Sequence, residues 1–366
     1  MYTRFFEGDI VTQEKQELVT STWTNNVNNL TVAFTASADN TDNGTSFASP
    51  TSSGQFFIDV YNADPASDTT AEVQYSVAYG NRLGSGSPAF TDDTGSIGIS
   101  AARVVYNQYR QLVFNDETQN FTFGSHTPNH IYVININRAR YKQRLTLGSL
   151  SLFISGGFVG ATTLGASRNV KTGSVRLTDD SVTNGSSGNS NLGPYYNIVS
   201  GSLGVLSGST INQTTSGSYG LFYPEAGLII LNPDQYQYGA NLANGTNGLQ
   251  PITGSSQGTN TDRNHVKLLD HISGANQFIV DTTEEINSQF YFVRARNNEY
   301  NYTNNQSFVD NNNNLLHDSM INNPKTFITT VGLYSDSNEL LGVAKLSQPV
   351  AKDFTKEALI RVKLDY

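Results

Sequence analysis

Three runs of alternating apolar residues near the end of the chain decide the fold class. Residues 326–334 have the sequence TFITTVGLY, residues 339–346 have ELLGVAKL and residues 357–364 have EALIRVKL. Apolar side chains recur at about every second position, which is the period of a β-strand with one buried face. Residues 335–338 (SDSN) form a turn after the first run, and Gln348-Pro349 opens a longer connection to the third. The pattern predicts a meander of three strands.

Similar patterns occur upstream. Further strands are expected at 56–61, 72–79, 131–137, 149–155, 277–281 and 289–296. The best helix pattern covers about 100–114, where Ser100 can cap a stripe of apolar residues at helical spacing, and a second short helix is expected over 264–272. The sequence therefore predicts a mainly β protein with one or two short helices and a multi-stranded, sandwich-like body.

Composition divides the chain into three regions. Residues 1–155 form an N-terminal arm and a β-rich body with one helix, with a loop at 36–54. Residues 156–262 are rich in Gly, Ser, Thr and Asn, which predicts a loop-rich β insertion lobe. Residues 263–366 are expected to form a C-terminal β module that completes the body and serves in assembly. Because neither half offers enough alternating strands to close a core, we expect strands from both ends to complete one body.

The residue types present exclude several classes of protein. The chain of 366 residues has no cysteine, which rules out disulfides, thiolate metal sites and a cysteine nucleophile. Its start shows no signal-peptide pattern, and no apolar run reaches the 18 residues of a membrane-spanning helix. We expect a protein made in the cytoplasm, without membrane insertion.

Charge is distributed unevenly. Residues 1–81 hold two Lys/Arg against ten Asp/Glu, whereas residues 82–176 hold ten against four, in a chain of net charge −9. A basic middle beside acidic neighbours fits electrostatic matching between subunits. A basic patch for nucleic acid is the rival interpretation of 82–176, but the net charge disfavours it, and no nucleic-acid partner is expected.

Four cations at a spacing of two are candidates for a subunit interface. On a strand, this spacing would place them on one face, where they would repel each other unless acidic groups met them. We expect that acidic surface on a partner or on the acidic segments of this chain. The four residues are Arg138, Arg140, Lys142 and Arg144.

The histidines, acids and glycines of the chain form no complete catalytic pattern. Pro128 stands between His126 and His130, so the pair cannot share a helical face as zinc ligands do. No Gly-x-Ser-x-Gly elbow or phosphate-binding loop is present, and Asp179-Asp180 is expected to be an exposed loop pair. The sequence predicts neither an enzyme nor a site for a cofactor or metal.

Several tyrosines in the predicted lobe could stack on sugars. Such residues more often belong to a core or a subunit contact, and both interpretations stay open. The candidates for glycan contact are Tyr195, Tyr196, Tyr219 and Tyr223.

The three terminal runs also carry a resemblance. Residues 327–346 and 358–365 resemble the attachment segments of tail-fibre and baseplate proteins. The fuller chain, including 297–303 (NNEYNYT), is similar to virion structural proteins of contractile-tailed bacteriophages, cyanobacterial ones particularly. Because the motif ends at Tyr366 with no repetitive shaft after it, we expect a compact subunit rather than a fibre.

The resemblance implies a structural subunit of the virion tail, assembled in the host cytoplasm, most simply a wedge-type baseplate component. Its partners would be other tail or baseplate subunits, with self-association as a further option. Tyr334 and Lys345, at the strand ends beside the predicted turn, are candidate interface residues. The alternatives are a peripheral receptor- or glycan-binding tail protein and a neck or collar protein.

Overall fold

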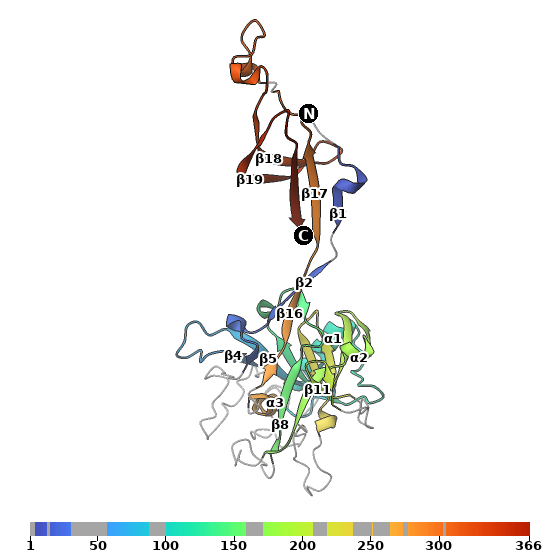
Figure 1. Ribbon diagram of the computed structural model, residues 1–366. Coiled ribbons are helices and arrows are strands. Elements are labelled where there is room, and N and C mark those ends of the chain that lie inside the picture. Colours follow the sequence, from blue (N-terminus) through green and yellow to red (C-terminus); the bar gives the residue numbers. More distant parts are fainter. Residues whose placement is uncertain are drawn as a thin grey trace. The chain divides into compact units, whose positions relative to one another are not determined.

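The computed structural model divides the chain into two compact units (Figure 1). The smaller comprises Met1–Glu17 and Glu285–Tyr366, and the larger comprises Leu18–Glu284. The chain passes from one to the other within β2 (Gln16–Ser21) and β16 (Asp281–Ile286), which belong to a three-stranded sheet with β7 (Arg144–Leu145). The structure describes residues 4–12, 15–30, 57–87, 100–158, 171–207, 218–236, 251, 264–273, 277–302 and 305–366.

The larger unit is built on one antiparallel sheet, which confirms the mainly β class. Two short strands, β10 (Gly188–Ser190) and β12 (Val205–Leu206), pair with β11 beside the main order. That order is β3 (Asn29–Leu30), β15 (Phe278–Ile279), β8 (Ser151–Phe158), β9 (Lys171–Asp179), β11 (Gly193–Ser202), β13 (Gly220–Tyr223), β14 (Leu228–Leu231), β6 (His130–Ile136), β5 (Val73–Asn81) and β4 (Phe57–Tyr61).

An aromatic cluster shows that this sheet curls. Strand β5 lies near one end of the order and β15 near the other, yet the rings of Tyr75 and Phe278 are 5.3 Å apart between centroids. Trp23 lies against both, 4.9 Å from Phe278 and 6.1 Å from Tyr75, and its Nε1 donates to the Phe278 carbonyl at 2.8 Å. The curled sheet thus encloses an apolar core between its two ends.

Two helices form where the sequence predicts them, and both pack on the sheet. Helix α1 (Ala101–Phe114) begins after Ser100, whose Oγ accepts from the Arg103 amide, and it packs its apolar side on β5. Helix α3 (Asn264–Ser273) packs on β5 and β8 with the enclosed core. A third helix, α2 (Ser181–Asn184), is a single turn. None of the helices in the described part of the chain is long and apolar enough to span a bilayer.

The range 156–262 is arranged differently from the lobe that its composition predicts. Its described strands β9, β11, β13 and β14 lie in the middle of the large sheet, between β8 and β6. Asp179 and Asp180 are buried at the end of β9 rather than exposed in a loop. Asp179 accepts from the Gly148 amide at 2.9 Å and Asp180 from the Asn197 amide at 2.9 Å, so both carboxylates satisfy partly buried backbone groups.

The smaller unit joins the two ends of the chain. Strands β1 (Ile10–Thr12), β17 (Ser288–Ala295) and β20 (Ala358–Asp365) form one sheet, and β18 (Thr326–Tyr334) and β19 (Leu340–Lys352) form a hairpin. The three terminal runs are therefore strands, as predicted. They are not one meander, because β20 pairs with β17 along eight residues instead of with β19. The sheet and the hairpin enclose Val331, Leu333, Ile360 and Val362.

These sheets also separate strands that we expected to join. Strands β17 to β20 pair only with one another and with β1, whereas β4, β5, β6 and β8 belong to the large sheet. The single body expected from both ends of the chain is replaced by two units with separate cores. The N-terminal segment supplies β1, which pairs with β17 of the smaller unit.

Candidate functional site

The outer face of the β18–β19 hairpin is the best candidate for a binding surface. Inward-facing Val331 and Leu333 are buried, whereas Leu341 and Val343 are 70% and 59% exposed. Tyr334, Leu340 and Lys345 are exposed on the same outer side, since Tyr334 pairs with Leu340 and Lys345 with Thr330. We call Tyr334, Leu340, Leu341, Val343 and Lys345 the hairpin face. It contains both interface residues predicted in this region.

A glycine shapes the hairpin face. Gly332 pairs with Val343, so the strand opposite this valine has no side chain at that point. The ring of Tyr334 lies over the gap, because a Cβ added at Gly332 would come within 3.0 Å of its Cε2 and 3.6 Å of the Leu340 Cδ1. Tyr334 and Leu340 therefore pack over the backbone of Gly332, and the phenol lies at the rim of an apolar patch.

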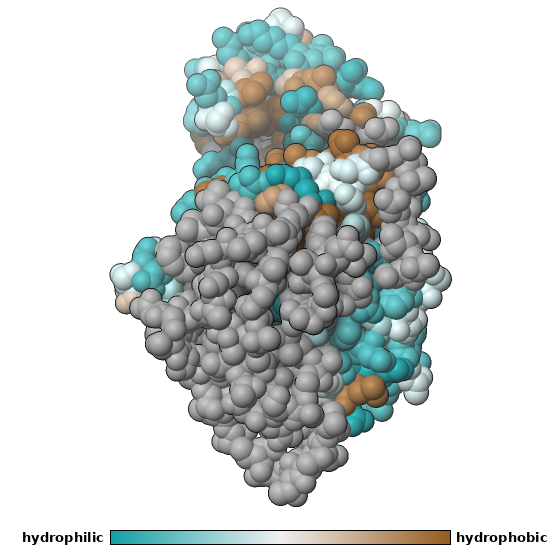
Figure 2. Space-filling model, turned by 90° about the horizontal axis from the view of Figure 1, so that it is seen from below, coloured by the Kyte–Doolittle hydropathy of each residue, from teal (hydrophilic) through white to brown (hydrophobic). Residues whose placement is uncertain are grey.

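Side chains rather than strand edges are suited to contact on this hairpin. Its pairing is irregular between Ile328 and Thr330 and between Leu333 and Tyr334, and Pro349 interrupts the amides of β19. Bulges and proline are features that discourage the addition of another strand. Figure 2 shows one face of the molecule, where the hydrophobic residues among those described form small groups between hydrophilic ones. On the hairpin face, Leu340, Leu341 and Val343 are exposed close to one another, and such a group of exposed apolar side chains is typical of a contact with another protein.

The four cations at 138–144 do not lie on one strand, contrary to the prediction. Residues Arg138–Arg140 form a 3₁₀ turn, which begins where the Asn137 side chain accepts from the Ala139 amide. Arg138 stacks on Tyr141, with its Cζ 4.6 Å from the ring centroid. Lys142 is exposed, while Arg144 is half-buried at the start of β7. The cap of Asn137 breaks the extended conformation that spacing alone predicted, so the four cations do not share one face.

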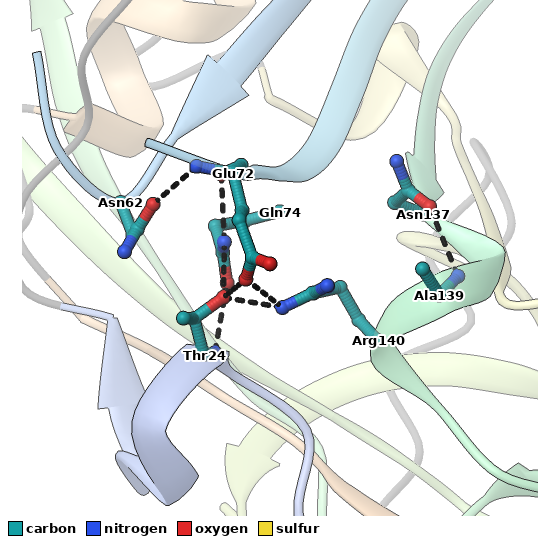
Figure 3. A network of polar contacts seen from close by, with 7 residues as sticks. All are labelled: Thr24, Asn62, Glu72, Gln74, Asn137, Ala139 and Arg140. Atoms are coloured by element: carbon teal, nitrogen blue, oxygen red, sulfur yellow. Dashed lines mark hydrogen bonds and ion pairs between the residues drawn. The ribbon is translucent and has the colours of Figure 1, made fainter. Parts of the chain in front are cut away.

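Arg140 does meet an acidic segment of this chain. Its guanidinium donates to the Glu72 carboxylate at 2.6 Å and to the Thr24 hydroxyl. Thr24 also donates to Glu72 at 2.8 Å, and the Gln74 amide donates to Thr24 at 2.7 Å, so these side chains turn towards one another (Figure 3). The Thr24 hydroxyl first, and then Arg140, lower the pKa of Glu72. Through this network, Thr24 before β3 is hydrogen-bonded to Gln74 of β5 and to Arg140 in the turn after β6.

Glu72→Gln is expected to reduce the free energy of unfolding of the larger unit by about 0.2–1 kcal/mol near pH 7, because the pair is partly exposed. A carboxylate whose pKa falls on folding stabilises the fold above its unfolded pKa, and this contribution is lost as pH falls through the folded pKa. The difference should therefore vanish in acid, as urea unfolding near pH 7 and near pH 3 would show. Glu117→Gln, at an exposed carboxylate, is the control. An equal loss at both pH values would contradict the role of the charge.

Two of the predicted loop histidines share a carboxylate. His126 Nε2 and His130 Nε2 lie 2.6 and 2.9 Å from the two oxygens of Asp234, which is 104 residues beyond His130. The hydrogen bond with His130 is the main cause that lowers the pKa of Asp234. No local pattern around Asp234 could have indicated this contact. Among the described residues, no group of three His, Asp or Glu side chains is placed to hold a metal ion.

The candidate glycan-contact tyrosines do not form one platform. Tyr196 and Tyr219 belong to the core enclosed by the curled sheet, whereas Tyr195 and Tyr223 pack on the opposite side under α1. Tyr223 and Tyr196 are buried, and burial raises the pKa of both phenols. Rings on opposite faces of one sheet cannot stack on a single sugar.

Comparisons of the chain with protein-family models, with curated proteins and with solved structures find no match.

Proposed function

We propose that the protein is a structural subunit of a phage tail, a wedge-type component of the baseplate that acts by binding other subunits rather than by catalysis. The residues that resemble tail attachment segments are those that build β18, β19 and β20. The single observation that carries the proposal is the hairpin face, where Leu341 and Val343 are exposed over a buried inner side.

The composition of the hairpin face suits a permanent contact. Leu340, Leu341 and Val343 supply apolar area in the centre, and each would contribute about 1.5–3 kcal/mol if a partner buried it fully. Tyr334 combines a large ring with a hydroxyl, and tyrosine is enriched among the residues that dominate binding energy. Lys345 at the rim would set orientation more than affinity.

Tyr334→Ala with Lys345→Glu is expected to leave the fold intact and to reduce incorporation into tail particles by roughly tenfold or more, since one tyrosine hot spot contributes about 2 kcal/mol. The measurement is an immunoblot of particles from a phage that lacks its own copy of the gene and receives the variant. Tyr302→Ala with Lys325→Glu makes the same changes at exposed positions away from the hairpin face. Normal incorporation of the first variant would show that this rim meets no partner.

A further inference from the structure

The sheet of the smaller unit presents a second, chemically different face. Residues of β17 and β20 alternate between the core and the outside, and the inward pairs are Tyr291 with Val362 and Val293 with Ile360. The outward pairs are Phe290 with Lys363, Phe292 with Arg361 and Arg294 with Leu359. We call Arg294, Arg361, Lys363, Phe290 and Phe292 the basic face.

The cations of the basic face are poorly compensated within the chain. Arg361 lies over the ring of Phe290, with its Cζ 5.2 Å from the centroid. Lys363 pairs with Asp365 at 2.9 Å, but both side chains are nearly half exposed, so water screens the pair. Within the described residues neither Arg294 nor Arg361 has an ion-pair partner. Like charges at i, i+2 and on a diagonal repel each other unless anions meet them.

Apolar residues flank these cations. Leu359 is 60% exposed beside Arg294, and Val11 of β1 is 46% exposed beside Phe290. Arginine together with aromatic side chains is the composition enriched in the centres of protein–protein interfaces. A partner that covers this face needs carboxylates opposite the cations and apolar groups at the two ends.

We infer that the basic face docks the acidic surface of a neighbouring protein subunit. This goes beyond the proposed function, on which it rests, because it gives the smaller unit a second contact that depends on charge. The net charge of the smaller unit around the basic face favours a protein surface over nucleic acid as the partner. Residues 1–17 and 285–366 hold ten Lys/Arg against thirteen Asp/Glu, a net of −3, which repels a long polyanion outside the face itself.

The test uses the purified chain and a short fluorescent peptide of glutamate residues, no longer than the basic face, and follows binding by anisotropy at about 20 mM and about 500 mM salt. A chain of net charge −9 should bind this probe only through a local cationic face. We expect binding at low salt that high salt abolishes, and a loss of at least about tenfold in Arg294→Glu with Lys363→Glu. Arg361 is left unchanged because it packs on Phe290.

Two further variants separate charge from folding and one face from the other. Arg294→Gln with Lys363→Gln should give an intermediate loss even if charge reversal disturbs the fold. Lys325→Glu with Lys345→Glu makes the same change of charge but alters the hairpin face, and it should keep binding of the glutamate peptide within about twofold while incorporation falls. Failure of the basic face and failure of the proposed function are thereby distinguished.

The other possible results of these experiments also support or overturn the inference. No binding, or an equal loss in the Lys325/Lys345 variant, overturns the inference. A single-stranded DNA oligonucleotide of matched charge that binds more tightly than the glutamate peptide, and whose binding is lost on charge reversal at Arg294 and Lys363, overturns it in favour of nucleic acid. Self-association in low salt that the same reversal removes supports it and identifies another copy of this chain as the acidic partner.

Discussion

Replacing Trp23 by alanine is expected to lower the free energy of unfolding of the larger unit by about 3–5 kcal/mol. Trp23 is 2% exposed and lies against Phe278 from β15 and Tyr75 from β5, which belong to opposite ends of the sheet order. The substitution leaves a cavity where the curled sheet closes, and it leaves the Phe278 carbonyl without its indole donor. The cavity and the lost hydrogen bond both weaken the contact that joins the two ends of the sheet.

Urea unfolding followed by far-ultraviolet circular dichroism measures this loss, since Trp23 is the chain's one tryptophan and its fluorescence disappears with it. Trp23→Phe keeps a ring but not the donor, and it should show an intermediate loss. Phe57→Ala, on β4 but half exposed, should change stability by about 0.5 kcal/mol or less. A loss below about 1 kcal/mol in Trp23→Ala would contradict closure of the sheet through this side chain.

Leu341→Asp with Val343→Asp is expected to abolish incorporation of the chain into tail particles without unfolding it. Both side chains point away from the core of the smaller unit, so the free protein can hydrate the new carboxylates. A docked partner would bury them unpaired, and an uncompensated buried charge costs at least several kcal/mol. We therefore expect incorporation to fall by more than about a hundredfold.

A matched variant isolates the position of the charges. Leu83 and Val205 in the larger unit are 57% and 72% exposed, close to the values for Val343 and Leu341. Leu83→Asp with Val205→Asp adds the same two charges at the same exposure and should incorporate normally. Equal incorporation of the two double variants would place attachment elsewhere than on the hairpin face.

Local periodicity accounts for what the sequence predicts correctly. The strands at 131–137 and 289–296 and the helix capped by Ser100 each follow from a pattern within about fifteen residues. Choice of partner does not follow from such patterns, which is why β20 was expected beside β19 although it pairs with β17. The alternation of β20 fits either neighbour. In the structure its inward residues pack with Tyr291 and Val293 of β17.

The candidate site residues show the same limit. Tyr334 and Lys345 could be placed on one face because the turn beside them fixes the register of the hairpin. The prediction of a strand with four cations on one face at 138–144 is wrong, because a spacing of two does not reveal that Asn137 caps a turn. A comparable set of cations on β17 and β20 was not recognised, since Arg294 and Arg361 are far apart in sequence and meet only through strand pairing.

The most direct test of the proposed function is the copy number of the chain in purified tail particles of the phage to which the proposal assigns it. Quantitative mass spectrometry with isotope-labelled peptides, calibrated against the tail-tube protein, gives this number per particle. A wedge-type subunit predicts a fixed number of copies per particle, the same from preparation to preparation. Absence of the chain from washed particles, or a variable trace amount, would contradict a structural role.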